Sequence, residues 1–223
     1  MQEDIRQRFE RLRVLSVGIL VFPDVEVLDF AGPFEVLSVA SRIAHAVIGV
    51  RTPLQVVLVG ADGATVMARH GMGVVPHTGF DAAPQFDLLF VPGGIVDQPL
   101  ADPATLAWIR HQHEGAALTA SVCTGALVLA RLGLLDGLEA TTHWDDIAGL
   151  RAQYPQVRVR DNIEYVDQGR IVTSAGIAAG IGMSLHLVGR ILGARMAIET
   201  ARRMEYEWKP VAQSHFVGRM SEA

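Results

Sequence analysis

The chain has 223 residues, of which 50% are hydrophobic and 19% are charged, and its formal net charge at pH 7 is −5. This composition predicts a folded domain with a sizeable core rather than a disordered chain, and without a run of Lys and Arg we expect no nucleic-acid partner. The single cysteine can form neither an internal disulfide nor a multi-thiolate zinc site, so we expect no metal and a cytoplasmic protein.

The N-terminal segment MQEDIRQRFERLR is charged throughout and lacks the apolar core of a signal peptide. We therefore predict that residues 1–13 are an N-terminal extension, either a surface helix or a loose segment. One domain is predicted over residues 14–208, because no linker, repeat or low-complexity tract interrupts them. Residues 209–223 are predicted to be a C-terminal tail.

Apolar runs of strand length alternate along the chain with amphipathic stretches of helical spacing. The predicted strands span residues 14–22, 53–60, 86–91, 116–122, 163–169 and 170–175, the last two as a possible hairpin. The predicted helices span residues 30–44, 102–115, 123–135, 145–155, 179–193 and 194–208. Residues 61–80 hold short β-like pieces typical of a small hairpin. This alternation predicts a single-domain α/β three-layer sandwich, with a mostly parallel sheet and helices on both faces.

Residues 171–189 contain no Asp, Glu, Lys or Arg, and their length is close to that of a membrane span. They also contain Thr, Ser, Gly and His side chains. We therefore interpret this stretch as a buried strand, a turn of small residues and a buried helix, and we expect no membrane association.

Three predicted turns are candidates for one shared site, because ligands bind at the carboxyl ends of strands in parallel sheets. The first contains FPDVEVLDFAGP, where Asp29 is predicted to stand just before a helix. Asp29 can cap that helix, or it can be a carboxylate that moves a proton, and both roles can hold together. Asp24 and Glu26 are expected to be solvated loop charges.

The second turn is VPGG. Gly93 and Gly94 allow tight backbone geometry after a buried strand, and their N–H groups could point at a developing anion. A glycine pair is also common in ordinary turns, so this signal is weak by itself.

The third turn, SVCTG, places Cys123 where a strand meets a helix. We expect the helix dipole to lower the pKa of the thiol, and the arrangement parallels the nucleophile elbow, in which a sharp turn exposes the nucleophile. The alternative is a buried, inert cysteine. Thr124 and Gly125 are small residues that leave the sulfur accessible, so both readings stay open.

His143 begins a predicted helix and could serve as a base for Cys123. A structural role beside Trp144 is favoured, because the sequence gives no geometry for the base. His111 and His113 lie two residues apart on a predicted helix and point in different directions, so they form no chelating pair.

Four segments together carry a family resemblance: LDFAGP, VPGG, SVCTGALVLARLGLLDGLEATTHW and TSAGIAAGI. They resemble the ThiJ/PfpI superfamily, which has the class I glutamine amidotransferase-like, flavodoxin-like fold, and within it most of all the isonitrile hydratases. The third segment is shared with the sensor domain of some AraC-type transcription regulators.

The resemblance implies that Cys123 is a nucleophile and that Asp29 is the acidic residue in contact with it. It implies that Thr124 helps to hold substrate and water, and that Gly94 and the Thr124 backbone N–H donate to an oxyanion. The implied reaction is attack of the cysteine on the terminal carbon of an isonitrile. Water then converts the thioimidate to an N-substituted formamide. The resemblance implies a small-molecule substrate, no cofactor and a homodimer, for which helices at residues 30–43 and 183–192 could supply the interface.

The sequence departs from the family pattern at two places. Gly182 stands where the matching segment commonly has Asp. Residues 95–100 (IVDQPL) also differ and are candidates to line the substrate pocket. The residue after Cys123 is Thr rather than His, which argues against protease activity.

Two other functions use the same thiol. One is a stand-alone small-molecule sensor related to the regulators. A regulator would need a DNA-binding domain after about residue 210, where this chain has a short tail. The other is a redox role through oxidation of Cys123. Turnover of a substrate separates the enzyme from both.

Overall fold

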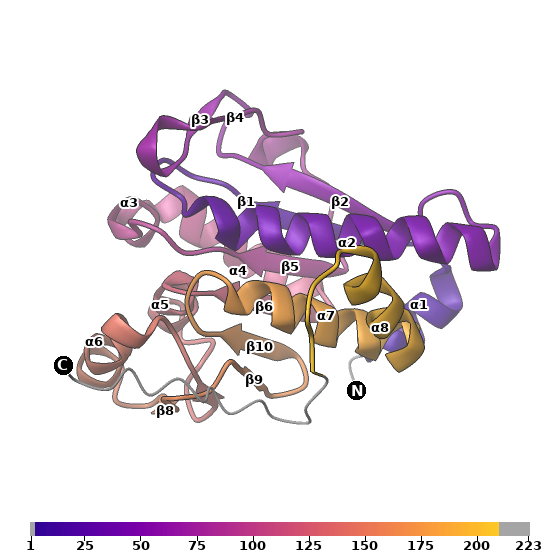
Figure 1. Ribbon diagram of the computed structural model, residues 1–223. Coiled ribbons are helices and arrows are strands. Elements are labelled where there is room, and N and C mark those ends of the chain that lie inside the picture. The colour runs from indigo at the N-terminus through magenta and orange to yellow at the C-terminus, as the bar shows by residue number, and fades with distance from the viewer. Residues whose placement is uncertain (1–2, 210–223) are drawn as a thin grey trace.

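The computed structural model describes residues 3–209. Its centre is a six-stranded sheet with the order β2-β1-β5-β6-β10-β9, in which only the edge strand β9 runs antiparallel to its neighbour (Figure 1). The strands are β1 Leu15–Leu20, β2 Leu54–Val59, β5 Leu88–Val91, β6 Leu118–Val122, β9 Tyr165–Asp167 and β10 Ile171–Ser174. The predicted parallel α/β sheet is confirmed, and so is the terminal β9–β10 hairpin.

Helices cover both faces of this sheet, which confirms the three-layer prediction. On the face nearer the viewer in Figure 1, α2 and α7 lie side by side in contact, joined by α8 and α1. The helices of that layer are α1 Ile5–Leu12, α2 Val27–Ile48, α7 Ala179–Leu192 and α8 Ala194–Arg203. The other layer contains α3 Asp97–Ala101, α4 Pro103–Gly115 and α5 Gly125–Arg131.

Two small additions extend this core. The predicted hairpin within residues 61–80 is present as β3 Val66–Met67 and β4 Gly73–Val74. Near the other edge, β7 Glu139–Ala140 pairs in parallel with β8 Arg158–Val159, and α6 Ile147–Gln153 lies between them in the chain.

The central strands β5 and β6 are buried along their whole length. Because helices cover both of their faces, these strands are apolar runs rather than alternating patterns. Residues 171–189 form β10, a turn and α7, as predicted. Within residues 3–209, no helix combines the length and the apolarity needed to cross a bilayer.

The start of α2 corrects the sequence prediction. The helix begins at Val27, its N-cap is Glu26, and Asp29 lies inside the first turn rather than before it. Asp29 does not cap the helix, because its carboxylate accepts a hydrogen bond from the Gly93 backbone. By contrast, Asp102 caps α4 as predicted and accepts from the N–H groups of Ala104 and Thr105.

The predicted N-terminal extension contains α1, a surface helix whose inner side reaches the core. Ile5 and Phe9 are buried, and Arg8 forms an ion pair with Asp87 at 3.2 Å. Except for Lys209, the predicted C-terminal tail lies outside the described residues. The dimer predicted through α2 and α7 stays a prediction.

We expect Phe9→Ala to lower the free energy of unfolding by about 3 kcal/mol, because it removes a buried aromatic ring and leaves a cavity. Leu12→Ala, at a side chain that is 44% exposed on the same helix, is the matched control and should cost less than about 0.5 kcal/mol. Urea unfolding measures both values. Equal, small losses in the two variants would show that α1 contributes nothing to the core.

Candidate active site

The three predicted turns meet at one point of the sheet. β5 lies between β1 and β6, so the turn after β5 touches the segments that follow both neighbours. Val25 forms a β-bridge with Gly94, and the Glu26 N–H donates to the Gly93 carbonyl at 2.9 Å. The carboxyl ends of the three strands therefore bring Asp29, the glycine pair and Cys123 into one site.

The close approach of the three segments in this site depends on Gly93. Its N–H donates to Asp29 Oδ2 at 3.0 Å. A Cβ at this position would lie 2.4 Å from Thr124 Oγ1 and 2.9 Å from Asp29 Oδ2. Only glycine lets the three segments approach this closely.

Thr124 connects the turn that contains Cys123 to the turn that contains Gly93 and Gly94. Its hydroxyl accepts from the Gly94 N–H at 2.9 Å and donates to the Gly94 carbonyl at 3.0 Å. The N–H groups of both Gly93 and Gly94 thus have partners inside the protein. Their use as oxyanion donors stays a prediction, and it would require these bonds to be exchanged for bonds to a ligand.

Cys123 occupies a strained turn between β6 and α5. Its φ is 56°, in the left-handed region that a residue with a side chain rarely adopts. The turn is held by bonds from the Cys123 N–H to the carbonyls of Ser174 and Ala175, both at 3.2 Å, and from Thr142 Oγ1 to the Cys123 carbonyl at 2.9 Å. Such strain persists only where the surroundings enforce it, and it is typical of a nucleophile elbow.

The protonation state of the thiol corrects the sequence prediction. Burial, and next the negative charge of Asp29, raise the pKa of Cys123 to about 12. Backbone N–H groups of Thr124 and Ile177 act in the opposite direction but are outweighed. The expected lowering of the pKa by the helix terminus is therefore wrong, and the resting site holds a neutral thiol.

Asp29 is fully buried, and its environment sets the acid–base character of the site. Burial raises the pKa of Asp29 to about 7, and the charge of Glu26 adds to this, while hydrogen bonds from Gly93 and Cys123 oppose it. Asp29 Oδ1 has no hydrogen-bond partner within ordinary distance among residues 3–209. Near neutral pH this carboxyl can both accept and donate a proton.

Glu26 was expected to be a solvated charge, and this is only partly so. Its carboxylate is 23% exposed and lies 3.5 Å from the guanidinium of Arg69. Asp24 is exposed, as predicted. Glu26 is thus a half-buried charge that acts on Asp29.

Ile177 was missed by the sequence analysis. It follows β10 in the segment TSAGIAAG and has a φ of 39°, an outlier for a β-branched side chain. Its backbone N–H is hydrogen-bonded to the thiol of Cys123 and lowers the pKa of that group. No residue-type signal predicts this backbone conformation, because isoleucine disfavours it.

His143 lies beside the site, but its contacts are not those of a catalytic base for Cys123. Its ring packs on Gly176, and its Nδ1 lies 3.6 Å from Asp146 Oδ2. No hydrogen bond between His143 and Cys123 is present in the described part of the chain. The ring is tilted against Trp144 with centroids 5.5 Å apart, and the accessory role of His143 stays a prediction.

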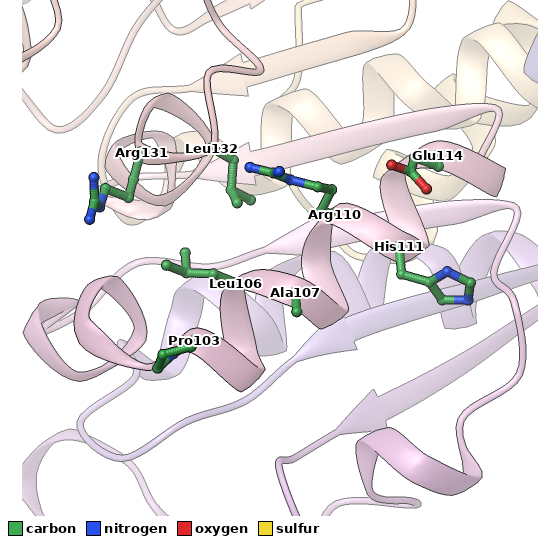
Figure 2. A pocket seen from close by; sticks show the side chains of 8 residues that line it. All are labelled: Pro103, Leu106, Ala107, Arg110, His111, Glu114, Arg131 and Leu132. Atoms are coloured by element: carbon green, nitrogen blue, oxygen red, sulfur yellow. The ribbon is translucent and has the colours of Figure 1, made fainter.

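A cavity of about 550 Å³ opens next to the cysteine turn, between α6 and the start of α7. Its wall includes Thr142, Ala175 and Ile177, which all bond to Cys123. A second hollow, shown in Figure 2, is an open groove of about 520 Å³ between α4 and the end of α5. None of its lining residues belongs to the cysteine site, and Arg131 points away from Arg110 in that view.

Other side chains predicted from the sequence have structural roles. His113 is buried and its Nδ1 lies 2.9 Å from Thr119 Oγ1, while burial lowers the pKa of His113 to about 4. His111 is exposed. Among residues 3–209 there is no group of three His, Cys, Asp or Glu suited to a metal ion.

Gly182 has a specific neighbour. A Cβ there would lie 1.9 Å from Glu164 Oε1. A carboxylate from the segment before β9 therefore occupies the space beside α7 that a side chain on residue 182 would need.

The model of the DJ-1/PfpI family matches residues 15–190. The chain belongs to the DJ-1/PfpI family. It is 37% identical over 199 residues to an isonitrile hydratase of Pseudomonas putida, covering 88% of this chain and 80% of the relative.

Other members of the family differ in function. The chain is 33% identical over 184 residues to the HTH-type transcriptional regulator CdhR of Pseudomonas aeruginosa. That match covers 82% of this chain and 53% of the regulator, so the chain spans about half the length of such regulators. Among solved structures, Drosophila melanogaster DJ-1beta superposes with a TM-score of 0.74 at 21% identity, over 87% of this chain and 100% of that one. This last likeness shows the fold.

We expect Asp29→Asn to stabilise the protein at pH 8 and to change its stability little at pH 4. The folded-state pKa of Asp29 is raised, so stability is fully present below the unfolded value of about 4 and is lost as pH rises through about 7. Thermal unfolding at the two pH values measures this, with an expected gain in Tm of about 3 °C or more at pH 8. A gain of equal size at both pH values would contradict the raised pKa.

Proposed function

We propose that this protein hydrates an isonitrile to an N-substituted formamide through covalent catalysis at Cys123. The observation that carries the proposal is the pairing of a strained cysteine elbow with a buried carboxyl whose pKa lies near 7. The 37% identity to an isonitrile hydratase supports the choice of substrate.

In the first step the sulfur forms a bond to the terminal carbon of the isonitrile. The thiol proton passes to the carboxylate of Asp29 as the S–C bond forms. Asp29 then returns that proton to the same carbon, which gives a thioimidate, R–N=CH–S–Cys123. A single carboxyl with a pKa near the working pH can act as base and then as acid.

In the second step water adds to the thioimidate carbon, and Asp29 accepts one water proton and donates it to the nitrogen, which gives R–NH–CH(OH)–S–Cys123. The C–S bond then breaks, the hydroxyl proton passes through Asp29 to the sulfur, and the product is R–NH–CHO. Thr124 lies beside both Gly93 and Cys123, where its hydroxyl can exchange its bonds to Gly94 for bonds to the water. The raised thiol pKa makes Cys123 a poor nucleophile at rest, so the proton transfer to Asp29 is required in each turnover.

A second candidate function is a stand-alone ligand sensor. The 33% identity to a transcriptional regulator supports it, because 82% of this chain aligns with about half of that relative. A sensor would bind the ligand at the same site without releasing a product.

We expect the wild-type protein to convert phenyl isonitrile to N-phenylformamide, and Cys123→Ala to reduce the rate by at least about 10³-fold. Liquid chromatography of the product measures the rate. Thr119→Ser, a conservative change inside β6 away from the sulfur, is the control and should retain activity. Binding of the isonitrile with no formamide in the wild type would reject the enzyme and favour the sensor.

We expect kcat/KM to rise with pH through an apparent pKa of about 7, because protonated Asp29 cannot accept the thiol proton. Initial rates between pH 5 and pH 9 measure the profile. Asp29→Asn should lose most of the activity together with this transition. A transition that persists in Asp29→Asn would assign the titration to another group.

A further inference from the structure

We infer that the groove between the second half of α2 and the edge strand β2 is a binding site for a small aromatic carboxylate. The groove has a volume of about 350 Å³, which lies within the range of small-molecule sites in proteins. It follows the outer side of β2, where the sheet ends (Figure 1). None of its lining residues belongs to the cysteine site, so binding there does not depend on the proposed function.

The charges in the wall of this groove favour an anion. Arg42, Arg51 and His45 line it, and none of the described residues in its wall is Asp or Glu. The chain as a whole has the opposite balance, with 24 acidic residues against 19 Lys and Arg. The planar fork of an arginine matches the two oxygens of a carboxylate. A carboxylate is therefore the ligand group that this wall recognises best.

Both guanidinium groups are available to such a ligand. Within residues 3–209, the side chain of Arg51 has neither an ion-pair partner nor a hydrogen bond. Arg42 lies 3.4 Å from Glu35, but the two side chains are 70% and 55% exposed. An ion pair this exposed contributes little, so Arg42 can exchange Glu35 for a carboxylate ligand.

The open edge of β2 adds uncharged donors beside the arginines. The N–H groups of Leu54 and Leu58 point outward and donate to Ser41 Oγ at 3.0 Å and to His77 Nδ1 at 2.8 Å. Val56 lies between them in the strand and lines the groove, and the alternation of strand hydrogen bonds directs its N–H to the same side. The Ser41 hydroxyl accepts from Leu54 and keeps its own hydrogen to donate. A carboxylate can thus take bonds from an arginine and from the strand edge together.

The apolar part of the wall fits a flat ring. Phe34 lines the groove, and its ring is stacked on His77 with an interplanar angle of 8° and centroids 6.3 Å apart. Leu54 and Val56 add aliphatic surface. An aromatic ring can stack on Phe34 while its carboxylate meets the arginines, and it loses less conformational freedom on binding than an alkyl chain does.

The test measures the binding of 2-naphthoate by isothermal titration calorimetry, with 2-naphthamide as a neutral ligand of the same shape. We expect a Kd of about 1 mM or lower for the carboxylate at low ionic strength, and binding at least about tenfold weaker for the amide. Arg51→Gln should raise the Kd for 2-naphthoate at least about fivefold. Arg195→Gln, at an exposed arginine on α8 outside the groove, is the matched control and should leave the Kd unchanged.

Three results would overturn the assignment: equal binding of the carboxylate and the amide, equal weakening by the two arginine substitutions, or no binding of 2-naphthoate at millimolar concentrations. A fourth result would overturn the ligand class, namely 2-naphthyl phosphate that binds at least about tenfold more tightly than 2-naphthoate and depends on Arg51 in the same way. None of these measurements requires turnover, so their failure is separate from a failure of the proposed function.

Discussion

The hydrogen bond from the Gly93 N–H to Asp29 is the contact on which the site depends. It joins the end of β5 to the first turn of α2 and turns the carboxylate inward, where burial raises its pKa to about 7. The same glycine leaves room for Thr124, which fixes the turn that carries Cys123. A side chain at residue 93 would separate all three segments.

The pKa of Cys123 differs from that of a cysteine activated by a helix N-terminus. A short helix behind the sulfur does not make a stable thiolate here, because desolvation and a nearby carboxylate act against the charge. In the proposed mechanism, reactivity depends instead on the neighbouring carboxylate of Asp29 as the proton acceptor. A pair of this kind is suited to a substrate that must gain a nucleophile and a proton at the same carbon, as an isonitrile does.

The sequence was sufficient to predict the layers, the parallel sheet and the meeting of three turns, because these follow from apolar runs and from the rule for strand ends. Asp102 could be recognised as a cap from its local neighbours. The role of Asp29 could not be predicted from its local neighbours, because its carboxylate accepts a hydrogen bond from Gly93, 64 residues away. The conformation of Ile177 and the raised pKa of Cys123 depend on the packing of distant segments, for which a linear pattern has no signal.

The central claim is that Cys123 and Asp29 act together on the isonitrile carbon through a covalent thioimidate. Intact-protein mass spectrometry of a rapidly acid-quenched mixture of protein and phenyl isonitrile tests it most directly. We predict a transient mass increase equal to one isonitrile, located on the peptide that contains Cys123, which decays as the formamide accumulates. Formamide that accumulates with no adduct at any quench time, or an adduct on another residue, would contradict the account.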